Sequence, residues 1–284
     1  MAKIHESSYE RAERGTMITH SDLPQSLLDS LGFDTSAKLR PINESMINAT
    51  YCISMDDEKF LLKKFYADDA TARSRPNLLA IQRKVAKYGL APNPVYLCQE
   101  QGLYAEEWVT PSVKPLAIES AETQMFALSR ALFLTHQLPI TTELLDIELV
   151  WQQYLSTVQG DISRFNAQIE QQLPLVNKIL DAKHNFVFCH NDLALGHILN
   201  HEKPIVIDWE YASTGNRYFD IRSSMAINRL SDAKCEMLIS EYSRLSGIPE
   251  RTIRAGLNEI EPIVNLTYKL WYAAIDEHLK RVNE

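Results

Sequence analysis

The residues with the clearest chemical potential lie between positions 186 and 220. Asp192 ends a polar trio that follows the apolar run Val187–Cys189, and Asp208 follows the apolar run Ile205–Ile207. Two carboxylates at the ends of neighbouring strands can divide a phosphoryl transfer between them. One holds a divalent cation against the phosphates, and the other accepts the proton of a hydroxyl nucleophile.

The spacing within this segment predicts a hairpin whose open end gathers polar side chains. Pairing Leu199 with Ile205 across the turn at 200–204 sets His197 beside Asp208. Opposed residues of an antiparallel pair lie ~4.5–5.5 Å apart. The loop that carries Asp192 runs into the same end. We therefore expect three polar side chains to meet at one rim, flanked by apolar strands.

The segment before residue 110 is predicted to be a small antiparallel sheet with a helix. Apolar and β-branched runs separated by turn residues indicate strands, and Gly89 marks the helix end. The expected strands are Ala37–Pro41, Ala49–Ser54, Phe60–Tyr66, Val95–Cys98 and Leu103–Val109, and the helix is Asn77–Tyr88.

The segment after residue 110 is predicted to be mainly helical, with a β island at Phe186–Ile207. The expected helices are Ser120–Leu138, Ile147–Gln172, Ser231–Leu245, Pro249–Asn258 and Pro262–Lys280. This order of elements predicts an α+β fold with two lobes. We expect an N-terminal lobe at 1–109, loosely held over 1–20, and a C-terminal lobe at 110–284 that contains the catalytic hairpin 186–208. A cleft between lobes is the default ligand site.

Composition narrows the function classes. The 284 residues carry 37 Asp and Glu against 29 Lys and Arg, a net charge of −8. This acidic excess argues against nucleic acid as a partner and does not exclude ATP, which a few local charges can hold. No apolar run approaches the ~18 residues of a membrane span, and the polar start is unlike a secretory signal. The four cysteines form no CxxC pair, so we expect free thiols and a cytoplasmic protein.

Two motifs carry a family resemblance. The segment His190-Asn191-Asp192-Leu193 and the segment Ile205–Ala212 (IVIDWEYA) resemble motifs of the aminoglycoside phosphotransferase and choline kinase superfamily, and most closely those of bacterial thiamine kinases and choline kinases. Further similar segments are Asn48–Tyr51, Phe60–Lys63, Gly89–Pro92, Leu103–Val109, Thr135–Pro139 and Phe219-Asp220, the last resembling a pair that buttresses the loop after the metal-binding Asp.

The resemblance implies a protein-kinase-like fold with an antiparallel N-lobe sheet and a mainly helical C-lobe. It implies ATP-dependent phosphorylation of the hydroxyl of a small, cationic metabolite, with thiamine as first choice and choline or ethanolamine as alternatives. An aminoglycoside is less favoured. By the same resemblance Asp192 is the catalytic base, Asp208 binds Mg²⁺, and Lys63 pairs with ATP phosphates. The adenine site falls on Glu107, Trp108 and Val109.

Three departures from the family pattern stand out. His197 replaces the usual Asn, and imidazole suits Mn²⁺ or Zn²⁺ better than Mg²⁺. Either Asp208 carries the metal nearly alone, or His197 contacts phosphate, or activity is weak. The loop Asn43–Ile47 lacks glycine and contains an acidic residue, and the helix Asn77–Tyr88 offers Gln82 in place of a Glu. A catalytically weak, kinase-like binding protein is the alternative that these departures raise.

Some assignments stay open at this level. Lys63 and Lys64 alternate along one strand, as do Glu106 and Glu107, and spacing alone does not say which of each pair faces a ligand. His190 is expected to be structural. Tyr268 and Trp271 share a helix face and form either ordinary core or, with Glu210, a substrate wall. Aromatic faces and acidic groups attract organic cations.

Overall fold

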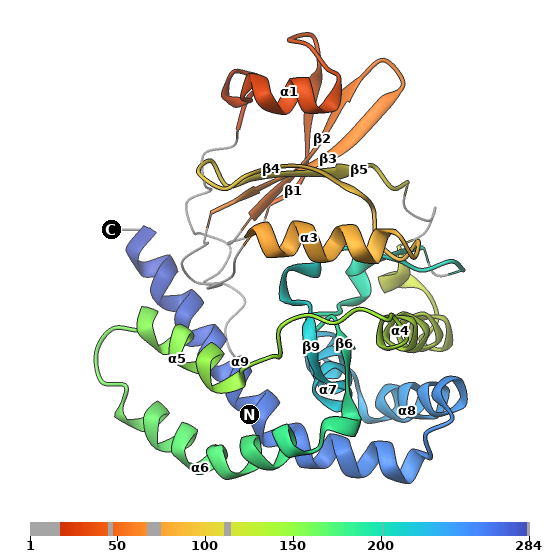
Figure 1. Ribbon diagram of the computed structural model, residues 1–284, viewed down its shortest axis with the longest axis vertical. Coiled ribbons are helices and arrows are strands. Elements are labelled where there is room, and N and C mark those ends of the chain that lie inside the picture. The colour runs from red at the N-terminus through yellow and green to blue at the C-terminus, as the bar shows by residue number, and fades with distance from the viewer. Residues whose placement is uncertain (1–17, 45–47, 67–74, 111–114, 201, 283–284) are drawn as a thin grey trace.

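The computed structural model describes residues 18–44, 48–66, 75–110, 115–200 and 202–282 (Figure 1). Of the loosely held N-terminus expected at 1–20, residues 1–17 lie outside the described residues. Of the loop expected at 43–47, residues 45–47 do so. The described chain builds a sheet-containing N-lobe and a helical C-lobe, as Figure 1 shows. The predicted α+β, two-lobed fold is therefore confirmed.

The N-lobe sheet has five strands in the order β1-β2-β3-β5-β4, all paired antiparallel. Its members are β1 (Lys38–Glu44), β2 (Asn48–Met55), β3 (Glu58–Phe65), β4 (Pro94–Cys98) and β5 (Leu103–Glu107). Each predicted strand is present within a few residues. Side chains alternate across a strand, so Leu62 of β3 packs in the N-lobe core while Lys63 points to the opposite face.

Two helices accompany the sheet. Helix α1 (Gln25–Leu31) buries Leu27, Leu28 and Leu31 against it and ends at Gly32, whose φ is +70°. Glycine adopts this left-handed conformation without strain, so the helix stops there. Helix α3 (Arg75–Ala86) lies on the side of the sheet that faces the C-lobe (Figure 1). It packs against β4 and against the segment that follows Asp208.

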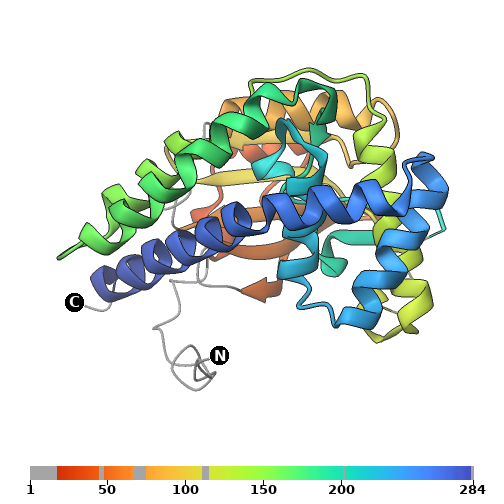
Figure 2. The same ribbon diagram turned by 90° about the horizontal axis from the view of Figure 1, so that it is seen from below.

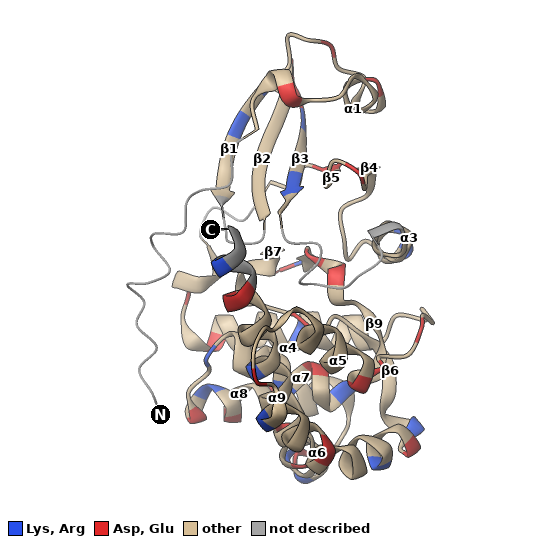
Figure 3. Cartoon of the chain, turned by 90° about the vertical axis from the view of Figure 1, so that its left-hand side faces the viewer, with Lys and Arg blue, Asp and Glu red and all other residues tan. Residues whose placement is uncertain are grey.

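The C-lobe is a set of helices around α9. They are α4 (Ala121–His136), α5 (Ile147–Thr157), α6 (Ser163–Asp181), α7 (Arg217–Ile227), α8 (Asp232–Ser246) and α9 (Glu250–Val282). Figure 2 shows α9 running along the lobe, where it contacts α5, α6, α7 and α8. Acidic and basic positions are interspersed along these helices (Figure 3). No helix within the described ranges combines the length and the apolar character that a membrane crossing requires.

The helix predictions needed three corrections. The single helix expected at 147–172 is two, because Gly160 adopts a φ of +87° between α5 and α6. The two helices expected at 249–258 and 262–280 are one, α9, which continues through Pro262. Ile260 and Ile263 are buried on either side of that proline, and their packing outweighs the lost backbone hydrogen bond. Helix α7 was not predicted, because its buried positions include polar residues that hide the apolar stripe.

Two short strand pairs support the predicted catalytic hairpin. Strand β6 (Phe186–Cys189) pairs with β9 (Ser213–Asn216), and β7 (Ile198–Asn200) pairs with β8 (Ile205–Val206). The predicted register is right at Ile198 opposite Val206. It is wrong one step later, because a register shift sets Asn200 rather than Leu199 opposite Ile205.

Candidate active site

The loop that carries Asp192 leaves β6 through a residue in the left-handed conformation. Asn191 has a φ of +65°, which Asn tolerates better than most side chains do. Its Nδ2 donates to the backbone oxygen of Tyr211 and to the hydroxyl of Ser213, each at 2.8 Å. These bonds tie the loop to the segment that follows Asp208.

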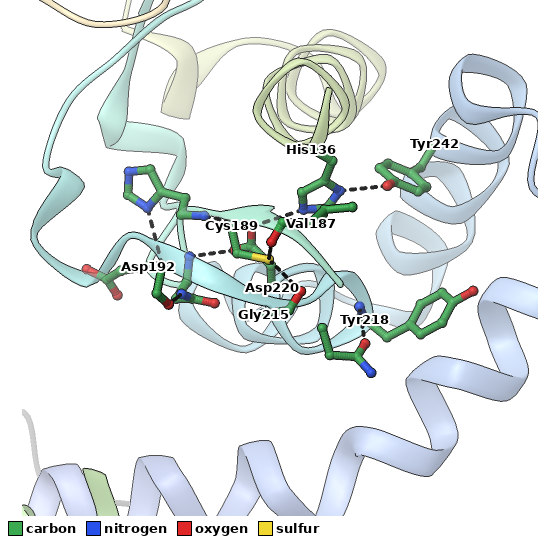
Figure 4. Close-up of polar contacts among 12 residues, drawn as sticks. His136, Val187, Cys189, Asp192, Gly215, Tyr218, Asp220 and Tyr242 are labelled. Atoms are coloured by element: carbon green, nitrogen blue, oxygen red, sulfur yellow. Dashed lines mark hydrogen bonds and ion pairs between the residues drawn. The ribbon is translucent and has the colours of Figure 1, made fainter. Parts of the chain in front are cut away.

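A buried aspartate on α7 accepts hydrogen bonds from the backbone of the same loop (Figure 4). Asp220 is fully buried, and its two oxygens accept the backbone N–H groups of His190 (2.9 Å) and Asn191 (2.7 Å). His136 Nε2 lies 3.1 Å from the carboxylate, and its Nδ1 lies 2.6 Å from the hydroxyl of Tyr242. Burial alone would raise the pKa of Asp220, but the bond and charge of His136 and the backbone donors outweigh it and lower that pKa. Asp220 thus buttresses the loop before Asp192, not the one after Asp208.

His190 fixes the backbone rather than offering a proton. Its Nε2 donates to the carbonyl oxygen of Ile207 at 3.0 Å, which leaves Nδ1 to accept the N–H of Asp192 at 3.3 Å. Burial, with the nearby His197 as a second cause, lowers the pKa of His190 to about 4. The imidazole is neutral at pH 7 and links the Asp192 loop to the strand end before Asp208.

Lys63, Asp208 and His197 meet across the two lobes. Lys63 Nζ donates to Asp208 Oδ1 at 2.7 Å, and His197 Nε2 lies 3.6 Å from Asp208 Oδ2. Burial opposes the charge on both members of the ion pair, yet Lys63 lowers the pKa of Asp208 and Asp208 raises the pKa of Lys63. The three side chains are 13–21% exposed, so a ligand can reach them. The predicted neighbourhood of His197 and Asp208 is confirmed.

Asp192 is a carboxyl in a strongly acidic surrounding. Burial, followed by the charges of Asp208 and Glu210, raises its pKa well above the ordinary value. Lys63 opposes this rise. A carboxylate with a raised pKa is a stronger base than an exposed one and can accept a proton from a hydroxyl near neutral pH.

The cluster opens into a cleft of about 310 Å³ between the lobes. Lys63 faces it, whereas Lys64 donates from the other side of β3 to the backbone oxygen of Gln101. The ambiguity between the two lysines is thereby resolved in favour of Lys63. The described lining residues are Asn43, Asn48, Thr50, Leu61, Lys63, Phe65, Leu78, Gln82, Tyr104, Glu106, Ala194, Gly196, His197, Ile207, Asp208 and Trp209.

Glu106 is a site residue that the sequence left undecided. It is 4% exposed and accepts hydrogen bonds from Gln82 Nε2 (2.5 Å) and from the hydroxyl of Tyr104 (2.9 Å). Its charge acts on Lys63, whose pKa it helps to raise after Asp208 and Glu210. The resemblance led us to look for a Glu on this helix. Gln82 occupies that place on α3 and contacts the carboxylate of Glu106 on β5. Strand alternation identifies Glu106 only once the pairing of β3 with β5 is known, because Glu106 shares a face with Tyr104, which lies opposite Lys63.

The three residues expected at the adenine site lie just beyond that face. Glu107 is exposed, and its Oε2 accepts from the backbone and side-chain nitrogens of Asn93 at 3.2 and 2.8 Å. Trp108 and Val109 are half-buried and follow the end of β5. None of the three is among the described residues that line the cleft.

Two of the three expected substrate residues, Glu210 and Tyr268, interact electrostatically with Asp192. Glu210 is buried and lines a second cavity of about 420 Å³, which shares Leu78 and Trp209 with the first. Burial, and next the charge of Asp192, raises the pKa of Tyr268, whose hydroxyl donates to the backbone oxygen of Ser223 at 3.4 Å. Trp271 is half-buried against the C-lobe core, beside the exposed Tyr272.

The cluster can hold a cation, but with a mixed donor set. Asp208 offers a carboxylate oxygen and His197 an imidazole nitrogen, whereas Mg²⁺ prefers oxygen alone. A second group, His136, Cys189 and Asp220, lies close enough together for a metal. Both nitrogens of its histidine and both oxygens of its aspartate already take part in hydrogen bonds, and the group is buried, so we read it as structural.

Comparisons with known proteins agree with this geometry. The model of the phosphotransferase enzyme family matches residues 38–257. The choline kinase LicA of Streptococcus pneumoniae, solved with AMP, is 16% identical, with 89% of each chain covered and a TM-score of 0.68. An ethanolamine kinase of Plasmodium vivax is 15% identical over 87% of this chain and 81% of its own, with a TM-score of 0.67.

A choline kinase of Cryptosporidium parvum is 14% identical over 93% of this chain and 90% of its own, with a TM-score of 0.65. At such identities the likeness establishes the protein-kinase-like fold. No curated protein sequence matches the chain significantly. The family match spans most of the chain and includes Lys63, Asp192 and Asp208. The protein is therefore a member of the phosphotransferase enzyme family.

Proposed function

We propose that the protein transfers the terminal phosphate of ATP to the hydroxyl of a small, cationic metabolite, with thiamine as the first candidate and choline or ethanolamine as alternatives. One observation carries the proposal. Lys63, Asp208 and His197 meet at the interlobe cleft, and the charge of Asp192 interacts with the same aspartate. Membership of the phosphotransferase family supports the reaction class.

The nucleotide belongs in the cleft beneath β3 and β5. Lys63 is the cation that faces it and would pair with the phosphates. The backbone of Glu107, Trp108 and Val109 at the end of β5 remains our proposal for the adenine contact, with LicA and its AMP as support from a similar fold. The divalent ion that such enzymes use neutralises phosphate charge, and Asp208 with His197 would hold it.

Asp192 is the proposed catalytic base. Its backbone is fixed by His190 and its loop by Asp220, so the carboxylate is held in position before the substrate arrives. The raised pKa keeps it basic enough to take the proton of an alcohol as the hydroxyl oxygen attacks the γ-phosphorus. The bond from that phosphorus to the bridging oxygen breaks, and ADP leaves with the bridging oxygen. The proton then resides on Asp192 and leaves to solvent after product release.

The proposal of a cationic substrate depends on charge. Asp192 is half-buried and Glu210 is buried. After burial and the charge of Asp208, the charge of Glu210 raises the pKa of Asp192, and a cation near these acids relieves that repulsion. Tyr268 and Trp271 are partly buried aromatic side chains of α9, and the charge of Asp192 acts on Tyr268. An ammonium or thiazolium group near these faces gains ~2 kcal/mol or more when desolvated.

The test is ADP release from ATP with Mg²⁺ or Mn²⁺ against thiamine, choline, ethanolamine and an aminoglycoside. We expect turnover on one cationic alcohol and loss of that turnover in Asp192→Asn. The matched control is Asp181→Asn, which changes an exposed aspartate at the end of α6 and should keep wild-type turnover. A neutral isostere of the preferred alcohol should lose about 30-fold in kcat/KM, the equivalent of ~2 kcal/mol. Turnover that survives in Asp192→Asn, or equal use of the neutral isostere, would contradict the proposal.

Two further assignments accompany this function. We propose that the lobes divide near residue 109, after β5. We also propose a cytoplasmic location, because ATP is the phosphate donor and all four cysteines are free thiols. Fractionation of the native host, with the protein followed by antibody, checks the location.

A further inference from the structure

We propose that His197 makes the metal position of this enzyme an imidazole–carboxylate site that binds a divalent transition-metal ion in preference to Mg²⁺. The inference rests on the proposed function for the phosphates that would complete the coordination. It concerns a residue at which this chain differs from its family, where an Asn is usual.

The first step is the orientation of the imidazole. His197 Nδ1 lies 2.8 Å from the backbone oxygen of Asp192. Nδ1 also lies 3.4 Å from the backbone nitrogen of Ala194, but the much shorter contact is to a carbonyl oxygen, which can only accept, so Nδ1 carries the hydrogen. The neutral ring then presents an unprotonated Nε2. A metal-binding histidine is usually oriented in this way, with its other nitrogen donating to a carbonyl or carboxylate.

The second step is what faces that nitrogen. Nε2 lies 3.6 Å from Asp208 Oδ2, while Lys63 takes the other oxygen, Oδ1. Two electron-pair donors face each other at a distance too long for a hydrogen bond. Metal–ligand bonds of ~2.0–2.2 Å let one ion reach both donors. The side chains are about one-fifth exposed, and both line the cleft, so an ion and phosphate oxygens can enter.

The third step is the match between these donors and an ion. Imidazole is a borderline-soft ligand that suits Mn²⁺, Co²⁺ and Zn²⁺, whereas Mg²⁺ binds oxygen and keeps its waters.

Electron paramagnetic resonance of Mn²⁺ tests this directly on the full-length protein with ADP, without turnover. We expect one bound Mn²⁺ per chain, with pulsed spectra showing coupling to a ¹⁴N nucleus of imidazole. Mg²⁺ should displace it only at a concentration at least ~10-fold above that of Mn²⁺. The variants are His197→Asn and His197→Gln, which offer an amide oxygen instead, and the control is His184→Asn, an exposed histidine in the C-lobe.

In both His197 variants the imidazole coupling should vanish and the preference for Mn²⁺ over Mg²⁺ should fall about 10-fold or more. The His184 variant should keep both. Unfolding temperatures confirm that each variant is folded, and His197→Gln serves if His197→Asn is not. Bound Mn²⁺ without ¹⁴N coupling, coupling that persists in the variants, or no Mn²⁺ binding with ADP would each overturn the inference.

The outcome separates this inference from the proposed function. Imidazole-coupled Mn²⁺ in a protein that phosphorylates none of the alcohols supports the metal site and contradicts the substrate proposal. Turnover with Mg²⁺ and no imidazole coupling supports the function and refutes the metal site.

Discussion

Replacing Asp220 by Asn should lower the free energy of unfolding, because Asp220 anchors the loop that carries Asp192. The fully buried carboxylate accepts two backbone N–H groups and lies 3.1 Å from His136 Nε2. An amide keeps one oxygen and turns its NH₂ toward at least one of these donors. Hydrogen bonds to a buried charged group contribute about 1.5–3 kcal/mol each, so the replacement should cost about 3–5 kcal/mol, a large share of the ~5–15 kcal/mol by which domains are stable.

Urea unfolding followed by tryptophan fluorescence measures this cost. With a slope of ~3 kcal/mol per molar urea, Asp220→Asn should lower the midpoint by about 1–1.7 M. The matched control is Asp181→Asn, the same chemical change at an exposed position, which should stay within ~0.5 kcal/mol of wild type.

The pH dependence of the difference identifies its origin. Because the pKa of Asp220 is lowered in the folded state, its contribution is fully present above the unfolded value of ~3.9 and disappears as pH falls through the folded value. The gap between wild type and Asp220→Asn should therefore be constant from pH 7 to about 5 and narrow below about 4. A midpoint unchanged within ~0.2 M, or a gap that does not narrow in acid, would refute the role given to this carboxylate.

Four further predictions concern the site and its support. Asp192→Asn should lower turnover by about 10²–10⁴-fold and leave the unfolding temperature equal or higher, since it relieves the repulsion between Asp192 and the charges of Asp208 and Glu210; a lower temperature would mean lost structure instead. In the wild type, kcat/KM should rise with pH through a pKa above ~3.9, because Asp192 must be ionised to act. A profile that rises instead at the ordinary pKa of an aspartate would argue for another base. Lys63→Met leaves Asp208 without its cation and should cost about 1–3 kcal/mol in urea unfolding, with ADP affinity down at least ~10-fold; unchanged ADP binding by calorimetry contradicts the assignment. Gly256→Ala should destabilise by about 1–3 kcal/mol in thermal unfolding, because an added Cβ meets the Tyr218 ring; a gain would show that the ring moves aside.

The fold was largely predictable because its elements follow local rules. The N-lobe strands alternate and are separated by turns, and each was found near its expected bounds. The errors arose where tertiary packing overrides local preference. Helix α9 continues through Pro262 since buried neighbours compensate, and α7 escaped notice because Asp220, Ser223 and Ser224 occupy its buried face.

The sequence predicted which residues lie at the site better than it predicted which of them contact one another. The hairpin spacing correctly set His197 beside Asp208. Spacing could not show that Lys63 contacts Asp208 or that Gln82 reaches Glu106, because each pair joins elements far apart in the chain. Which of Glu106 and Glu107 faces the cleft depends on strand register, and register is fixed by the folded sheet.

The backbone at Asp208 limits the ways in which this enzyme can be lost or changed during evolution. Its φ of +68° suits Gly, Asn and Asp, and burdens any other residue with roughly 1–2 kcal/mol of strain, whatever its chemistry. Two constraints therefore act on position 208: the proposed contact with the metal favours a carboxylate, and the backbone conformation favours the small set of residues that tolerate it. A descendant that abandons catalysis but keeps the fold should carry Asn or Gly at 208 more often than Ala or Ser. Such a residue in a related chain would indicate a protein that has lost catalysis while its fold is still under selection.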